Sequence, residues 1–129
     1  MSTKDFWPDN RVKYDLNTIM REYTGTDGHY RNEYSLNLTY TQAIRDMARQ
    51  WEAYWLILEL ATVQSKLPNE LVLVLRLERT ARDSGSFILT ADDGNGNILS
   101  TTNIANSDFP FDSAKFYIEN NVILLPSER

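Results

Sequence analysis

The longest hydrophobic pattern in the chain lies between Thr41 and Leu67 and predicts a central helix. Its apolar residues recur at steps of three and four, which is the spacing of one helix face. They are Ile44, Met47, Ala48, Trp51, Tyr54, Trp55, Leu58 and Ala61. At 1.5 Å per residue a helix of this length would reach roughly 40 Å, so we expect a kink or break near Arg49–Glu52. Thr41 is the expected N-cap, and Pro68 prevents the helix from continuing.

The residues before this helix predict shorter elements. Residues 1–14 show no clear period, and we expect a loosely ordered arm that lays its aromatic side chains on a domain spanning residues 15–129. Asp15 is the expected N-cap of a first helix that stops near Gly25. Residues 23–34 are rich in glycine, threonine and aspartate and predict a loop, and the alternation that follows it predicts a short strand.

After Pro68 the hydrophobic period changes from that of a helix to that of a strand. Leucines at 71, 73, 75 and 77 point to one face of a predicted strand that packs on the central helix. Residues 87–91 and 98–102 predict two more strands, and the sequence DDGNGN at 92–97 predicts the hairpin between them.

The last segment predicts a short helix and a strand. Asp112 is the expected N-cap of a helix over residues 113–120, and Phe111 and Phe116 have the spacing of a hydrophobic staple. The apolar run 122–125 predicts the final strand.

These elements predict an α+β domain in which an antiparallel sheet of four to five strands packs against a long, kinked central helix and two shorter helices. The expected core consists of Trp51, Tyr54, Trp55, Leu58, Leu71, Leu73 and Leu75.

Composition and charge exclude several classes of function. The chain has 129 residues, of which 42% are hydrophobic, as in one globular domain. It has no cysteine, which excludes disulfides, zinc–thiolate sites and thiol catalysis. Its formal net charge of −5 disfavours a nucleic-acid-associated regulator, because binding to phosphates needs a basic surface. The first residues lack the layout of a signal peptide, and the apolar run is too short for a membrane span, so we expect a cytoplasmic protein.

Five motifs, in this order, resemble a known family. They are YTGTDGHYR at 23–31, TYTQAI with AYWLILELATVQ within 39–64, DDGNGN at 92–97, DFPF at 108–111 and FYIENNVILLPSE at 116–128. The chain resembles an uncharacterised family of small bacterial proteins that are common in cyanobacteria and found on phages and plasmids. It departs from that family at Gln42–Ala43, where the family usually has Asp-Gly, and at Trp51–Glu52, where relatives tend to carry glycine. The resemblance implies a fold and a mobile-element setting and carries no assigned activity.

The candidate for catalytic chemistry is His29, the single histidine, beside Asp27, Tyr30 and Arg31. A histidine in such a loop can act as a general base. No motif ties a serine nucleophile to it, so we predict no catalytic residue; an exposed histidine, or one that fixes the turn, explains the same sequence.

Other polar groups have alternative interpretations. Asp92, Asp93, Asn95 and Asn97 resemble part of a calcium loop, but the EF-hand pattern fails and a hairpin turn accounts for them. Arg31, Arg76, Arg79 and Arg82 either form a basic patch for an acidic ligand or pair with nearby carboxylates. Glu59 is either a functional carboxylate or a group that reaches solvent or an arginine. We therefore predict no metal and no cofactor.

The function that we favour from sequence is a non-enzymatic accessory protein of mobile-element or phage type that binds another protein, with modulation of a host or defence system as one role. The expected contact surface is the 24–31 loop, with Asp27, His29, Tyr30 and Arg31, extended by Phe6 and Trp7. Tyrosine, tryptophan and arginine are favoured in interface hot spots. The partner is an unidentified protein, and a homodimer is also open. A small enzyme or ligand-binding domain centred on His29 is the alternative.

Overall fold

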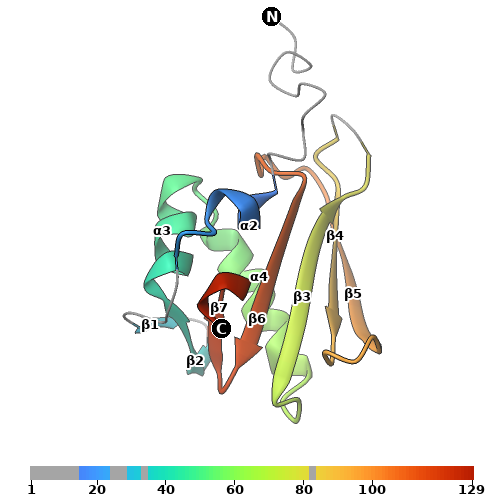
Figure 1. The fold of residues 1–129 in the computed structure, drawn as a ribbon. Helices are drawn as coiled ribbons and strands as arrows, with labels where there is room; N and C mark the ends of the chain where they lie inside the picture. The colour runs from blue at the N-terminus through green and yellow to red at the C-terminus, as the bar shows by residue number, and fades with distance from the viewer. Residues whose placement is uncertain (1–14, 24–28, 33–34, 82–83) are drawn as a thin grey trace, which may run out of the picture.

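A computed structural model describes residues 15–23, 29–32, 35–81 and 84–129 (Figure 1). Its helices are α2 (Leu16–Ile19), α3 (Gln42–Gln50), α4 (Tyr54–Lys66) and the 3-10 turn η2 (Pro126–Glu128). Its strands are β1 (His29–Asn32), β2 (Ser35–Thr41), β3 (Val72–Arg79), β4 (Phe87–Asp92), β5 (Ile98–Ile104), β6 (Ser113–Glu119) and β7 (Val122–Leu124).

Within the described residues the strands form one sheet in the order β1-β2-β7-β6-β3-β4-β5. All neighbours are antiparallel except β2 and β7, which are parallel. The α+β class is confirmed, but the expectation of four to five antiparallel strands is wrong, because the sheet is mixed and has seven strands. The two additional strands are β1, in a segment that the sequence assigned to a loop, and β6, in one that it assigned to a helix.

The predicted break in the central helix is confirmed. Thr41 caps α3 by accepting a hydrogen bond from the backbone N–H of Ile44 at 3.4 Å. The chain then leaves the helix at Glu52, whose φ of 51° lies in the left-handed region, and α4 begins at Tyr54. A left-handed residue cannot continue a right-handed helix, so one apolar stretch becomes two helices, α3 and α4.

The predicted helix over residues 113–120 is wrong, because this segment forms β6. Ala114, Phe116 and Ile118 are buried and the residues between them are partly exposed, which is the period of a strand. Asp112 therefore caps no helix, and Phe111 and Phe116 form no staple. Asn120 and Asn121 do adopt the expected left-handed conformation, with φ of 51° and 63°, but as the two-residue turn between β6 and β7.

The first helix begins where the sequence predicted, since Asp15 accepts a hydrogen bond from the backbone N–H of Asn17 at 3.3 Å. It ends at Ile19, well before Gly25. Residues 1–14 and 24–28 lie outside the described residues, so the predicted arm and most of the predicted loop stay predictions.

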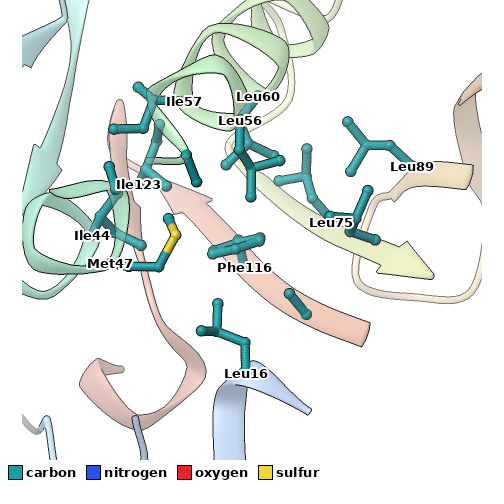
Figure 2. Packing of buried hydrophobic residues seen from close by; sticks show 14 of the residues in the cluster. Leu16, Ile44, Met47, Leu56, Ile57, Leu60, Leu75, Leu89, Phe116 and Ile123 are labelled. Carbon is teal, nitrogen blue, oxygen red and sulfur yellow. The ribbon is translucent and has the colours of Figure 1, made fainter. Parts of the chain in front are cut away.

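The core lies between the helices and the inner face of the sheet, and Figure 2 shows Leu56, Leu60 and Met47 close to Phe116 of β6. Leu73 and Leu75 are buried as expected, whereas Trp51, Trp55 and Leu58 are only partly buried.

Two core predictions are wrong: Tyr54 is 49% exposed and Leu71 is 84% exposed. The break at Glu52 changes the helical phase, so α4 buries Leu56, Ile57, Leu60, Ala61 and Val63 instead. Leu71 precedes the first paired residue of β3 and has no neighbouring strand to cover it.

A charged groove as the candidate functional site

An open groove of about 360 Å³ lies where α2 and η2 meet the outer face of β3 and β6. In Figure 1 both α2 and η2 lie beside β6, and α4 lies behind the sheet. The groove is lined by the polar residues Asp15, Asn17, Arg76, Glu78, Ser113 and Lys115, together with Ala114 and Pro126. We call this site the charged groove.

One wall of the groove is built by hydrogen bonds between α2 and the edge of β6. Lys115 pairs with β3 on one side, but on the other side β7 pairs only with the last part of β6, so no described strand lies beside Lys115 there. The side chain of Asn17 takes that place: its Nδ2 donates to the Lys115 carbonyl at 2.8 Å, and its Oδ1 accepts from the Lys115 N–H at 2.6 Å. The amide thus imitates a paired strand and satisfies both backbone groups.

Asp15 fastens the same wall. Its carboxylate caps α2 and also accepts a hydrogen bond from the Ser113 hydroxyl at 3.2 Å. A parallel bridge joins the two backbones at Asp15 and Ser113. The position of α2 on the sheet is therefore fixed by short polar contacts at two successive outer-face residues of β6.

The floor of the groove carries charges in rows across β3 and β6. Arg76 lies directly opposite Lys115, and Glu78 lies directly opposite Ser113. Side chains of such pairs are close, with Cβ atoms about 4.5–5.5 Å apart, and two like charges in this position repel each other. A cationic row therefore lies next to an acidic row that Asp15 completes.

The two cations are held differently. Arg76 forms an ion pair with Asp92, and its side chain is 41% exposed. The ammonium of Lys115 lies 5.3 Å from the centre of the Tyr117 ring, and no described carboxylate is within ion-pairing distance of it. Lys115 is thus available to an external anion, whereas Arg76 is partly neutralised.

Tyr117 extends the basic side of the groove. Burial raises the pKa of its hydroxyl, but hydrogen bonds and positive charge from Lys115 and Arg129 outweigh burial and hold the pKa below the ordinary value of 10.0. The guanidinium of Arg129 lies 4.0 Å from the ring centre and forms an ion pair with Glu119. The phenol is therefore surrounded by cations, which favours acceptor groups of a ligand nearby.

The residues that the sequence proposed for binding lie elsewhere. Phe6, Trp7 and Asp27 are outside the described residues. The backbones of His29 and Arg31 belong to β1, but their side chains are not described. Tyr30 is described: its hydroxyl donates to Gln42 Oε1 at 2.6 Å, and its ring lies 4.4 Å from the guanidinium carbon of Arg45. These contacts tie Tyr30 to α3, and the proposed surface around it stays a prediction.

The arginine and aspartate candidates are mostly used inside the fold. Arg79, with a side chain only 7% exposed, pairs with Asp112 and is not part of an open basic patch with Arg76. Asp93 accepts hydrogen bonds from the backbone of Asn95 and Asn97 within the 92–97 hairpin. The hairpin interpretation of DDGNGN is confirmed.

Comparison with known protein families matches residues 14–129 to a family of unknown function (DUF6876). The chain belongs to this family. The match confirms the resemblance to an uncharacterised family that the sequence motifs indicated. No curated protein and no solved structure matches the chain. DUF6876 has no assigned activity, so membership of the family implies no function for the chain. Among the described residues, none of the helices has the length and apolarity needed to cross a bilayer.

Sequence reasoning about this DUF6876 chain identified Asp15 only as a helix cap and Arg76 only as one of several arginines. It did not single out Asn17, Glu78, Ser113 or Lys115. The signal that would have found Ser113 and Lys115 is the strict alternation of polar and apolar residues from 113 to 119, which also predicts β6.

Proposed function

We propose that the protein is a non-enzymatic accessory protein that acts by binding another protein, and that the charged groove docks an extended, charged segment of that partner. The observation that carries this proposal is the pair of adjacent rows on β3 and β6, cationic at Arg76 and Lys115 and acidic at Glu78 with Asp15. In the phage or mobile-element setting that the sequence resemblance suggests, the partner is a host protein.

The spacing of the rows defines the segment. Arg76 and Glu78 are two residues apart on one strand, so the rows are about 6.6 Å apart at 3.3 Å per residue. An extended peptide also repeats its side chains on one face every two residues. A segment of the form Glu-x-Lys therefore places its carboxylate over the cationic row and its ammonium over the acidic row.

Hydrogen bonding in the groove favours recognition over catalysis. The Ser113 hydroxyl donates to Asp15, and the same carboxylate caps α2, so this pair holds the wall of the groove. The near balance of acidic and basic groups also differs from the uniformly basic surface that a nucleic-acid backbone requires.

The test is an NMR titration of the isotope-labelled protein with two short peptides of identical composition. One has Glu and Lys two residues apart, and the other has them adjacent. We expect only the first to shift the backbone amide signals of Arg76, Glu78 and Lys115, with weak affinity. Lys115→Met should reduce that affinity about 5- to 10-fold, since it removes the Lys115 ammonium but keeps the length of the side chain.

Lys66→Met is the matched control, because Lys66 is an exposed lysine at the end of α4, away from the groove. It should leave peptide binding unchanged. Equal binding of the two peptides would show that the charged groove does not distinguish the spacing of the charges. Changes in amide signals only outside β3 and β6 would show that the peptide binds elsewhere.

A further inference from the structure

Strand β5 forms one end of the sheet, at the right of Figure 1. Within the described residues it pairs with β4 alone, so every second residue directs its N–H and C=O away from the sheet. β5 is seven residues long, whereas β1 at the opposite end has four. Edge strands of this length offer a template for another strand unless something blocks them.

The usual blocking devices are nearly absent from β5. Its sequence, ILSTTNI, contains no charged residue and no proline. The one irregularity lies at its start, where Asp92 pairs with Ile98 and Ala91 with Ser100, so that Leu99 is the extra residue. From Ser100 to Ile104 the strand is regular, and Ile98 and Leu99 at its start are exposed, at 66% and 37%.

We propose that a second copy of this chain pairs with β5 in antiparallel orientation and continues the sheet across a two-fold axis. An interface of this kind needs a surface that complements itself. The sequence of β5 is partly symmetric about Thr101: serine and threonine flank it and isoleucine stands at both ends, whereas Leu99 and Asn103 differ. Antiparallel pairing about Thr101 therefore places Ser100 beside Thr102 of the second copy.

The same register brings Ile98 of each copy to the end of β5 that carries Ile104 in the other copy, which covers the exposed Ile98 side chain; Ile104 itself is already partly buried against the core. No charges meet across the axis, although the whole chain has a net charge of −5. β5 thus offers an uncharged edge along which two acidic chains can approach each other. The pairing is independent of the charged groove, which lies on β3 and β6.

Single cysteines test the register, because the chain contains no natural cysteine. In the proposed pair the two copies of residue 101 face each other with Cα atoms about 4.5–5.5 Å apart, within the range that a disulfide spans. Thr101→Cys should therefore form a disulfide-linked dimer under mild oxidation. Asn103→Cys is the matched control on the same exposed side of β5. Its two copies would be about four residues out of register, more than about 13 Å apart, and should not link.

Sedimentation of the cysteine-free protein at concentrations up to about 1 mM tests association itself. We expect a concentration-dependent dimer that Thr101→Lys weakens at least tenfold, since it sets two like charges opposite each other. Thr62→Lys, at an exposed threonine of α4, should leave the dimer unchanged, as should Lys115→Met. A monomer at every concentration, or equal linking of both cysteines, or a dimer that Thr101→Lys does not weaken, would overturn the proposal.

Discussion

Arg79, at the end of β3, joins this strand to the distant segment 109–112 and to nearby Ser84, and its replacement tests how they are held together. Its side chain is only 7% exposed. The Nε atom donates to Asp112 Oδ1 at 2.9 Å, and Nη2 donates to the carbonyls of Phe109 and Phe111 at 2.9 and 3.1 Å. Nη1 donates to the carbonyl of Ser84. The guanidinium thus connects β3 to the segment that leads into β6.

The same side chain packs on an aromatic cluster. Its guanidinium carbon lies 4.5 Å from the centre of the Phe87 ring, and Phe87 and Phe109 lie edge to face with ring centres 5.9 Å apart. Trp55 of α4 lies against Phe109 in the same manner at 6.0 Å. Loss of Arg79 therefore removes an ion pair, several hydrogen bonds and a cation–π contact at one place.

The expected cost of Arg79→Ala is about 3 kcal/mol in the free energy of unfolding. Removing one partner of a buried ion pair typically costs about 3–5 kcal/mol, because the other charge stays behind without compensation. The Asp112 side chain is 24% exposed, so water can solvate the carboxylate that is left without its partner. We therefore expect a cost at the lower end of this range. With an unfolding entropy of about 2.1 cal/mol/K per residue, the melting temperature should fall by about 10 °C.

Urea denaturation followed by tryptophan fluorescence measures this loss. Arg79→Lys should lose about half as much, because an ammonium keeps the charge but cannot reach several carbonyls as the planar guanidinium does. Arg49→Ala, at an exposed arginine of α3, is the control and should change stability by less than about 1 kcal/mol. A loss below about 1 kcal/mol for Arg79→Ala would refute the structural role of this network.

Three further changes test other parts of the fold. Trp55→Ala should cost about 2–3 kcal/mol in urea denaturation, at or below the low end for a tryptophan, because Trp55 is only partly buried. Hydrogen bonds from the Asn97 side chain and from the backbone of Asn95 and Asn97 hold the pKa of Asp93 below 3.8. The stabilisation by the ionised Asp93 carboxylate is fully present above the unfolded pKa and is lost as pH falls through the lowered folded pKa. Asp93→Asn should therefore lower the melting temperature at neutral pH, and its effect should shrink as pH falls below 3.8. Glu52→Gly should raise stability by about 1 kcal/mol, because glycine adopts the left-handed conformation without strain; an unchanged or lower value in urea denaturation would contradict this.

Features that depend on local chemistry were predictable from the sequence. The cap at Thr41, the turn at 92–97 and the end of α4 before Pro68 each rest on a few neighbouring residues. The break in the central helix followed from the length of the apolar stretch, and the structure locates it at Glu52. The helix phase after the break did not follow, since it depends on how α4 packs on the sheet.

Features that depend on long-range pairing were not predictable in the same way. The parallel pairing of β2 with β7 joins Thr39 and Tyr40 to Val122 and Ile123, which are far from them in sequence. β1 has few strand-forming residues and is held by its register with β2, from Tyr30 opposite Tyr40 to Arg31 opposite Thr39. The glycines before this segment and the asparagine within it favour a loop, and no pattern of strand-forming residues around 29–32 outweighs them.

The segment 113–119 explains why the charged groove was missed. Its apolar residues alternate, but a stretch of seven residues after Asp112 also suits a capped helix, and the staple spacing of Phe111 and Phe116 favoured the helix. In a helix, residues two apart are rotated by about 200° around the axis, so Ser113 and Lys115 would point in nearly opposite directions. In a strand they share one face, and pairing with β3 sets Lys115 opposite Arg76. The charge pattern of the groove therefore exists only in the sheet register. The groups around His29 are neighbours in sequence, whereas Arg76 and Lys115 become neighbours only through strand pairing.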